Sequence, residues 1–428
     1  MTRTYWIETL GCPKNQVDSD KISGKLVADG YVAATDASAA DLVVVNTCAF
    51  VEEARQESID TVLALSDDRA DDARIVVTGC MAERYGDELA DALPEIDTVA
   101  GFGRDFTAAP RRSLIPVASA PLPTFDLLNL PRPASSAPWA YVKIAEGCDR
   151  NCGFCAIPSF RGPQRSRSVD DIVVEVEALQ VREIVLVAQD LAAFGRDQGV
   201  GERSIVPLVR RVSEVVDWVR LLYLYPSDLS DELIDAMLGA GVPYFDLSLQ
   251  HVSPPLMRRM RRWGNGQKFL DRIERIRSLD AAAAFRSNFI VGYPGETEAD
   301  HDALLAFVDA AQLDWCGFFA FSDEEGTYAH TLDGHVERGL IDDRLAELRE
   351  LQDGITASRR DALLRHELTV LVDAPGEARS FREAPEIDGI VNVPTDLAVG
   401  EFHTVSVTGA EGPDLVAEAV ASSIGAAP

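Results

Sequence analysis

The sequence predicts an α/β protein with three domains: an open parallel α/β sheet at the N-terminus, a partial (β/α)6 barrel in the centre and a small antiparallel β-barrel at the C-terminus. Three observations support this fold class. Short apolar strands alternate with helical segments over residues 4–101, six more strands follow in the same rhythm from Tyr141, and the chain after residue 366 changes to short strands with Pro and Gly. Strand–helix alternation is typical of parallel sheets, and short strands with turn residues are typical of small barrels.

The first domain is expected to span residues 1–115. Its strand candidates are TYWIETL, DLVVVNT and RIVVTG, separated by periodic segments such as SDKISGKLVADG. This is the pattern of repeated βαβ units, so a parallel sheet is expected. Residues 116–137 are rich in proline and are expected to form an extended linker.

The central domain is expected to span residues 138–363 and the C-terminal domain residues 364–428. The six central strand candidates are AYVKIAEG, REIVLVAQD, VRLLYLYP, YFDLSLQH, FRSNFIVGYPG and WCGFFAFS. Their spacing favours a partial barrel, although spacing alone leaves an open sheet as the alternative. The segments ELTVLVDA and FHTVSVTG in the last domain suit a barrel of the oligonucleotide-binding kind.

The composition indicates a soluble, cytoplasmic protein. Of the 428 residues 46% are hydrophobic and 26% are charged, which is typical of globular proteins. We find no basic-then-apolar leader and no long uninterrupted apolar run, so neither secretion nor membrane spanning is expected. Seven cysteines, an odd number, favour reduced thiols for metal binding or catalysis over a disulfide framework. The net charge of −30 repels nucleic acid and would attract a basic partner.

Three cysteines lie close together in EGCDRNCGFC, residues 146–155. Cys148, Cys152 and Cys155 follow the first strand of the predicted barrel, where such barrels place their chemistry. Closely spaced thiolates suit zinc or an iron–sulfur cluster. A structural zinc site usually has four ligands, whereas three ligands on a four-iron cluster leave one iron open. A structural zinc loop remains the alternative.

Three other cysteines each follow a predicted parallel strand of the first domain. Cys12 comes after TYWIETLG, Cys48 after DLVVVNT and Cys80 after RIVVTG. The carboxyl ends of parallel strands gather along one edge of the sheet, so these thiols are expected to meet there. The alternative is that they are small core side chains, which we expect for Cys316 within the apolar strand WCGFFAF.

The Cys-x3-Cys-x2-Cys spacing, with Phe154 before its third cysteine, resembles the radical S-adenosylmethionine (SAM) enzymes. In that family the open iron of a 4Fe-4S cluster chelates SAM, and one-electron reduction yields a 5′-deoxyadenosyl radical. The segments GCPKNQ (11–16), NTC (46–48) and TGC (78–80) resemble the N-terminal domain of the methylthiotransferases, a radical SAM family. The resemblance implies a second 4Fe-4S cluster, held by Cys12, Cys48 and Cys80, that donates sulfur.

The resemblance extends over essentially the whole chain and also implies a substrate. IPSFRGPQRSRS (157–168) and FIVGYPGETEAD (289–300) are similar to family segments, and VAQDLAAFG (187–195) and EAPEIDGIV (383–391) are closer to the RimO branch than to the branch that modifies tRNA. That branch implies a methylthio group placed on the β-carbon of an aspartate in ribosomal protein S12, a TRAM-like C-terminal barrel and an electron donor such as flavodoxin or ferredoxin. The candidates for holding SAM are Phe154, Gln189, Asp190, Gln250, Gly292 and Glu296.

The charge of the C-terminal domain bears on the substrate independently of the resemblance. Residues 366–428 contain 11 acidic side chains and 2 arginines, a net charge of −9. Modules that bind RNA normally present a basic face, so this domain is expected to prefer a basic protein surface and not to bind RNA directly. Three alternatives remain at this point: an acidic face that only maintains solubility, the same chemistry on a tRNA adenosine, and a non-catalytic iron–sulfur or zinc protein.

Overall fold

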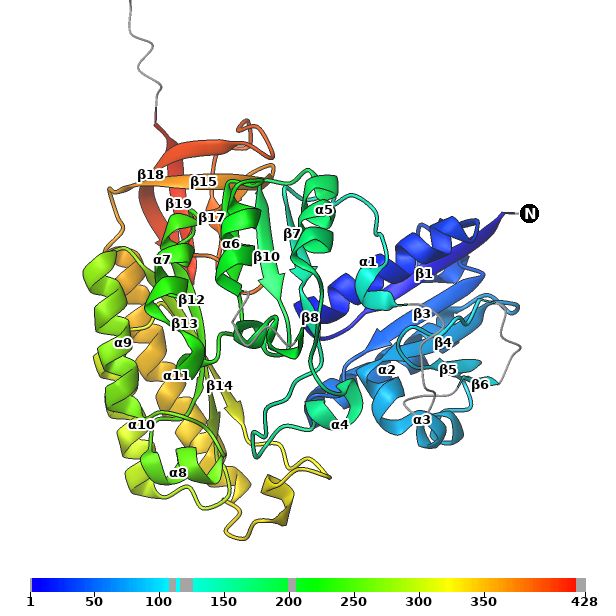
Figure 1. The fold of residues 1–428 in the computed structure, drawn as a ribbon, viewed down its shortest axis with the longest axis horizontal. Coiled ribbons are helices and arrows are strands. Elements are labelled where there is room, and N and C mark those ends of the chain that lie inside the picture. The colour runs from blue at the N-terminus through cyan, green and yellow to red at the C-terminus, as the bar shows by residue number, and fades with distance from the viewer. Residues whose placement is uncertain (1, 108–112, 116–125, 199–204, 421–428) are drawn as a thin grey trace, which may run out of the picture.

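The computed structural model describes residues 2–107, 113–115, 126–198 and 205–420, and it shows the three predicted regions as separate units in contact (Figure 1). The N-terminal unit is a six-stranded sheet in the order β2-β1-β3-β4-β5-β6. Its strands, all parallel, are β1 (Arg3–Thr9), β2 (Tyr31–Ala33), β3 (Leu42–Thr47), β4 (Arg74–Gly79), β5 (Thr98–Ala100) and β6 (Ser113–Ile115).

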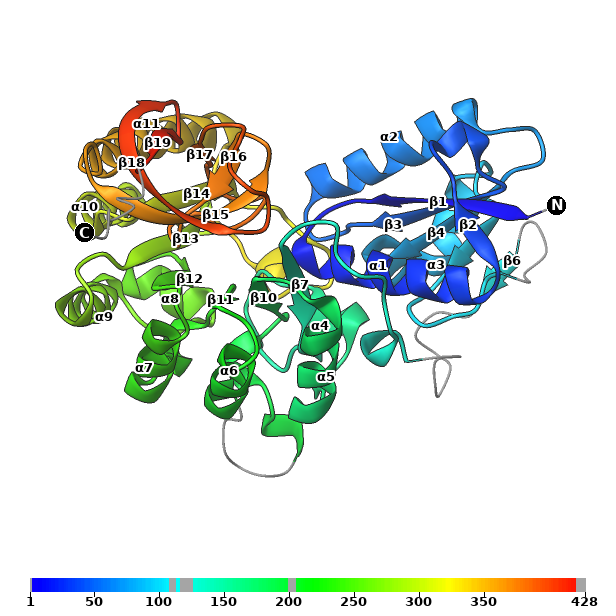
Figure 2. The ribbon, with the colours of Figure 1, turned by 90° about the horizontal axis from the view of Figure 1, so that it is seen from above.

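Helices cover both faces of this sheet. They are α1 (Pro13–Ala28), α2 (Glu52–Asp68) and α3 (Cys80–Ala92). α1 and α2 lie on opposite faces of the sheet (Figure 2), and α3 packs on the same face as α2. Every residue of β3 is buried, because the central strand of a covered parallel sheet has no exposed face. The strands expected from sequence are confirmed as β1, β3 and β4. The three-residue strands β2, β5 and β6 were not predicted, because so short a strand carries no periodic pattern.

The central unit has the six predicted strands. They are β7 (Trp139–Lys143), β10 (Glu183–Val187), β11 (Trp218–Leu221), β12 (Tyr244–Gln250), β13 (Ala284–Val291) and β14 (Trp315–Ala320). They form two parallel sheets, β11-β10-β7 and β12-β13-β14, and a parallel bridge between Leu224 and Leu247 joins them. A partial barrel is therefore confirmed and the open sheet is excluded.

Helices follow the barrel strands in turn. They are α5 (Val169–Leu179), α6 (Ile205–Ser213), α7 (Asp231–Gly239), α8 (Pro254–Arg259), α9 (Gly266–Leu279), α10 (Glu298–Ala311) and α11 (Arg338–Asp361). Between β7 and α5 the chain adds a small hairpin and one short helix: β8 (Ala145–Glu146), α4 (Ile157–Arg161) and β9 (Arg165–Ser166).

The C-terminal unit is a closed five-stranded barrel in the order β15-β16-β17-β19-β18. Its strands are β15 (Glu367–Ala374), β16 (Glu377–Arg379), β17 (Val391–Asn392), β18 (Phe402–Glu411) and β19 (Asp414–Ala419). The prediction of an antiparallel barrel needs one correction, because β17 and β19 are parallel. An odd number of strands cannot alternate in direction all the way round a closed barrel, so one neighbouring pair has to be parallel.

This small barrel packs against the beginnings of the central strands. The Tyr141 hydroxyl donates to the Pro385 carbonyl at 2.7 Å, the Tyr244 hydroxyl donates to Asp388 at 2.6 Å and the Trp315 indole N–H donates to the Arg382 carbonyl at 2.8 Å. The C-terminal unit therefore covers the end of the central barrel opposite the loop that carries Cys148.

The N-terminal unit contacts both edge strands of the partial barrel. On one side, Lys143 at the end of β7 pairs with Asp18 of α1. On the other, Glu324, which follows β14, pairs with Arg55 at 2.5 Å and Arg84 at 2.7 Å. The N-terminal unit thus closes the open side of the barrel.

The expected extended linker lies partly outside the described residues, which resume at residue 126. From there the chain packs against the protein: Leu127 and Leu128 are buried and the Leu128 carbonyl accepts from Lys21 at 2.6 Å. No helix in the described part of the chain has the length and apolarity needed to cross a membrane.

Candidate functional site

The loop that carries Cys148, Cys152 and Cys155 is held at the carboxyl end of β7 by backbone hydrogen bonds. Cys148 N–H donates to the Gly162 carbonyl at 3.1 Å, and Gly153 N–H donates to the Met260 carbonyl at 2.8 Å. Gly147 has a φ of +79°, and a side chain there would overlap the Pro163 carbonyl. The loop therefore has a fixed shape before any ligand binds.

Two of these sulfur atoms accept hydrogen bonds from the protein. The backbone N–H of Arg150 donates to Cys148 Sγ, and Arg262 Nη1 donates to Cys152 Sγ, each at 3.4 Å. Burial raises the pKa of Cys148 to about 11 and that of Cys155 to about 12. A metal centre bound here would have to displace these protons, as is usual for thiolate ligands.

The sheet edge brings Cys12, Cys48 and Cys80 together, as predicted from their places after β1, β3 and β4. One side chain connects their strands. Asn15 Nδ2 donates to the Leu10 carbonyl at 2.9 Å and to the Thr47 carbonyl at 3.1 Å, so it joins the segments just before Cys12 and Cys48. Its Oδ1 accepts from Arg161 at 2.9 Å, and Arg161 also donates to Cys80 Sγ at 3.0 Å.

The electrostatic surroundings of these three thiols differ. Burial raises the pKa of Cys48 to about 12 and also raises that of Cys80. Burial acts in the same direction on Cys12, but the positive charges of Lys14 and Arg161 outweigh it, and the pKa of this thiol is lowered. Gly11 sits so close to Cys48 that a Cβ there would lie 2.8 Å from the cysteine Cβ.

Each three-cysteine set suits an iron–sulfur cluster by its donors, since thiolates are the usual ligands of such clusters. All seven cysteines are free. Among residues 2–107, 113–115, 126–198 and 205–420, no three His, Cys, Asp or Glu side chains come close enough to hold a single metal ion. The fit of each site to an iron–sulfur cluster therefore rests on its three thiols and on the protein hydrogen-bond donors directed at their sulfur atoms. Cys316 packs against the barrel core, as predicted.

The side chains proposed to hold SAM occupy the same end of the barrel. Gln189, just past β10, donates to Glu146 at 2.8 Å, while its buried Oε1 has no hydrogen-bond partner among the described residues. Gln250, at the end of β12, has a φ of +72°, which is uncommon for a residue with a side chain. Phe154 packs against a small buried cluster that includes Tyr293 and Met260. An unpaired buried carbonyl oxygen is available to a ligand amino group, which fits SAM.

The other three candidates are engaged by the protein itself. Glu296 accepts from the Gly292 N–H at 2.6 Å with one carboxylate oxygen and from Arg344 at 3.0 Å with the other. Asp190 accepts from Arg150 Nε at 2.5 Å. These contacts indicate that Glu296 supports the turn after β13 and that Asp190 orients Arg150, while contact with SAM stays a prediction for Asp190, Gly292 and Glu296.

Family models match all three units of the chain. Residues 4–101 match Uncharacterized protein family UPF0004, residues 142–308 match the Radical SAM superfamily and residues 366–420 match the TRAM domain. The ribosomal protein uS12 methylthiotransferase RimO of Moorella thermoacetica is 41% identical over 94% of this chain and 95% of its own. The RimO proteins of Streptomyces coelicolor (40%; 99% and 98% covered) and Kineococcus radiotolerans (39%; 97% of each) are similar over nearly their full length. The chain belongs to the RimO family of radical SAM methylthiotransferases.

A solved structure supports the fold. The radical S-adenosylmethionine methyltransferase TsrM from Kitasatospora setae superposes with a TM-score of 0.50 at 15% identity, covering 74% of this chain and 73% of its own. At that identity the likeness concerns the fold alone. In this chain the loop with Cys148, Cys152 and Cys155 follows β7, at the carboxyl end of the barrel, where such barrels place their chemistry.

Sequence reasoning missed the buried polar groups that connect the two cysteine sets. Lys143 and Arg161 each form ion pairs with both Asp18 of the N-terminal unit and Glu146 of the central unit. Burial opposes ionisation of Glu146, but Arg161 and Lys143 outweigh it and lower its pKa to about 2. The Asp18 partner of Lys143 is 125 residues away in the sequence, and no local pattern marks it.

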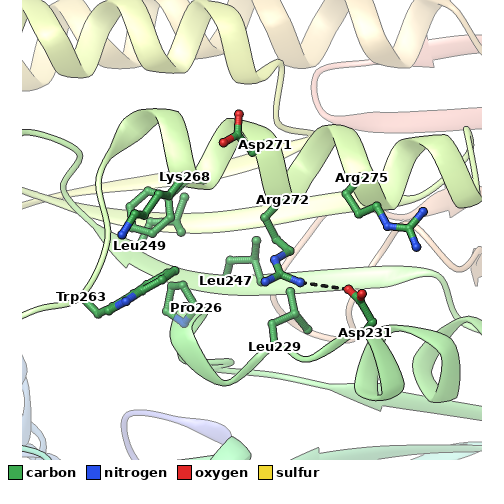
Figure 3. A pocket seen from close by; sticks show the side chains of 11 residues that line it. Pro226, Leu229, Asp231, Leu247, Leu249, Trp263, Lys268, Asp271, Arg272 and Arg275 are labelled. Carbon is green, nitrogen blue, oxygen red and sulfur yellow. Dashed lines mark hydrogen bonds and ion pairs between the residues drawn. The ribbon is translucent and has the colours of Figure 1, made fainter.

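A cavity of about 400 Å³ lies elsewhere on the central unit (Figure 3). It is lined by Trp263, Leu247 and Phe269 and by charged residues of α9, and Arg272 pairs with Asp231 across it. None of the cysteines or proposed SAM contacts lines it.

Proposed function

We propose that this protein inserts a methylthio group at the β-carbon of an aspartate in ribosomal protein S12. The observation that supports the proposal is that each of two neighbouring parallel sheets carries three cysteines just past the carboxyl ends of its strands. Cys148, Cys152 and Cys155 would hold the 4Fe-4S cluster that binds SAM, and Cys12, Cys48 and Cys80 would hold a second one. When bound, these groups supply hydrogen abstraction from an unactivated C–H bond and the sulfur to be inserted, which side-chain acids and bases cannot supply.

The chain's own residues would bind SAM, orient it and exclude water from it. Gln189 Oε1, which has no hydrogen-bond partner among the described residues, would accept from SAM, and Gln250 and Phe154 would contact the same ligand. The guanidinium groups of Arg150 and Arg262 each lie 4.0 Å from the Tyr225 ring. The backbone N–H of Arg150 donates to Cys148 Sγ, and Arg262 Nη1 donates to Cys152 Sγ. Such fixed donors hold the ligand set in one geometry, which favours reaction between correctly placed partners.

The C-terminal unit supports a basic protein as the substrate. Both of its arginines are buried in ion pairs, Arg379 with Glu183 and Asp373, and Arg382 with Glu383 and Asp314. Its exposed acidic side chains are Glu367, Glu377, Glu386, Asp396, Glu401, Glu411 and Glu418. Lys and Arg are otherwise absent from residues 366–420, so the exposed face is acidic and repels RNA phosphates.

The position of this acidic face defines its role. The C-terminal unit covers the barrel end opposite the cysteines, so its carboxylates cannot touch the reacting atoms. We assign them to docking of a basic protein, with faster association as the expected benefit. A reduced flavodoxin or ferredoxin would supply electrons, and the cytoplasm, where ribosomal proteins are assembled, would be the site of action.

The test offers the reconstituted enzyme two substrates under anaerobic conditions with SAM and a reductant. Purified S12 and unfractionated tRNA are incubated separately, and the products are analysed by mass spectrometry. The proposal expects methylthiolated aspartate in S12 and unmodified tRNA. Methylthiolated adenosine in tRNA with unmodified S12 would assign the protein to the tRNA reaction instead.

A further inference from the structure

Arg161 occupies a position between the two cysteine sets. It ends α4, which begins two residues after Cys155, and its side chain is buried. The residue before it, Phe160, packs in the core of the N-terminal unit. The segment that leaves the SAM-side loop therefore enters the other domain directly.

The guanidinium divides its donors between carboxylates and the second cysteine set. Nη1 lies 3.3 Å from Asp18 and 3.1 Å from Glu146. Nη2 donates to Asn15 Oδ1 and, at 3.0 Å, to Cys80 Sγ. The face of the guanidinium stacks on Phe102 at 4.0 Å. These contacts fix the orientation of the guanidinium, so its Nη2 is held in hydrogen-bond contact with Cys80 Sγ.

We propose that Arg161 is a positioning residue that sets the reduction potential of the centre held by Cys12, Cys48 and Cys80. This inference rests on the proposed function, which assigns a cluster to those cysteines. Arg161 cannot ligate iron, because a guanidinium offers only donors. It acts through Cys80, whose sulfur receives both the hydrogen bond and the positive charge.

The physical basis is general. Reduction adds negative charge to an iron–sulfur cluster, and a hydrogen bond or cation at a ligand sulfur stabilises the reduced form. Asp18 and Glu146 partly neutralise the charge of Arg161 but also fix its direction, so the directional N–H···S contact is the main contribution. Removing Arg161 should make the centre harder to reduce.

The experiment measures that potential without enzymatic turnover. In a full-length variant with Cys148, Cys152 and Cys155 replaced by alanine, only the second centre remains, and its reduction is followed by electron paramagnetic resonance at fixed applied potentials. Arg161→Gln is compared with Arg161→Lys and with Arg165→Gln, an exposed arginine of the same segment that pairs with Asp126.

Arg161→Gln is expected to lower the ratio of reduced to oxidised centre at least tenfold at a fixed potential, which is about 59 mV for a one-electron couple. Arg161→Lys should lower it less, since the charge is kept and the fork is lost, and Arg165→Gln should leave it unchanged. An unchanged ratio in Arg161→Gln, with iron content intact, would overturn the inference. Should Arg161→Gln fail to fold, an unchanged ratio in Arg161→Lys overturns it equally.

Failure of the proposed function gives a different result. If the parent variant lacking Cys148, Cys152 and Cys155 binds no iron after reconstitution, no second centre exists and the assignment of Cys12, Cys48 and Cys80 is wrong. If the parent variant binds iron but its reduction potential is the same with and without Arg161, the second centre exists and only the proposed role of Arg161 is wrong.

Discussion

Asp388 shows how strongly one residue's surroundings can alter its chemistry. It lies in the C-terminal segment that enters the central barrel, where Tyr244 donates to it and Arg286 lies 3.4 Å away. Burial raises its pKa from 3.8 to about 6, although Arg286 and Tyr244 act in the opposite direction. The inward charge of Arg286 thus has structural partners, Asp388 and Asp246.

This pKa predicts a pH-dependent stability. Between pH 3.8 and about 6 the folded protein keeps a proton on Asp388 that the unfolded chain releases, so the free energy of unfolding falls as the pH rises through that window. Asp388→Asn cannot ionise, so its stability relative to the native protein should rise by about 2 to 3 kcal/mol from pH 4 to pH 7. Denaturant unfolding at a series of pH values measures this difference. Asp396→Asn, exposed on the same domain, is the control. A stability difference for Asp388→Asn that stays constant with pH would contradict the prediction.

The turn after β13 carries two of the residues proposed to hold SAM, Gly292 and Glu296. Gly292 has a φ of +83°, and a Cβ there would overlap the Ile341 side chain of α11. Gly295, in the same turn, has a φ of +85°, but its nearest neighbour is the flexible guanidinium of Arg259 at 3.1 Å. Both glycines have a positive φ, which favours glycine, but only Gly292 lacks space for a side chain.

Alanine substitutions at Gly292 and Gly295 distinguish the cost of backbone strain from the cost of steric overlap. Gly295→Ala is expected to cost about 1 kcal/mol from the backbone alone, and Gly292→Ala about 2 to 4 kcal/mol because the packing of α11 is disturbed as well. Gly292→Ala should also weaken SAM binding to the reconstituted protein, since the turn would shift. Thermal unfolding and equilibrium dialysis with SAM measure the two effects. Equal losses in the two variants would show that the contact with Ile341 does not matter.

Among the secondary-structure elements, those with a periodic or apolar sequence pattern were predicted, and those without such a pattern were missed. β1, β3, β4 and the six barrel strands carry apolar runs, and their order gave the positions of all six cysteines of interest. The strands of three residues, the parallel pair β17–β19 and the short helix α4 lack a periodic signal. The role of Arg161 was missed for a related reason: the motif IPSFRGPQRSRS marks the segment but does not show which side chain reaches Cys80.

The whole molecule depends on how the N-terminal unit is attached to the barrel. Glu324, which is buried in the segment after β14, forms ion pairs with Arg55 and Arg84. The Ser322 hydroxyl oxygen accepts a hydrogen bond from the Glu52 backbone N–H at 3.3 Å. The ion pairs of Lys143 and Arg161 with Asp18 of α1 form the other attachment. The second cysteine set is therefore held over the barrel from two sides.

Removing the Glu324 carboxylate should loosen one attachment. Glu324→Ala leaves two arginines facing each other without their shared partner, which is expected to cost about 3 kcal/mol in unfolding free energy. The neighbouring Glu325 is exposed, so Glu325→Ala is a matched control with little expected change. Differential scanning calorimetry compares the two variants. Identical unfolding temperatures would show that the Glu324 contacts do not hold the N-terminal unit.

The proposed reaction requires two separate iron–sulfur centres, so its most direct test is the iron and sulfide content of anaerobically reconstituted protein. The native chain is compared with a variant in which Cys12, Cys48 and Cys80 are replaced by alanine. About eight irons per native chain and about four in the variant are predicted, since each three-cysteine set would hold one four-iron cluster. About four irons in both proteins would contradict the account, because the chain would then have no centre from which to donate sulfur.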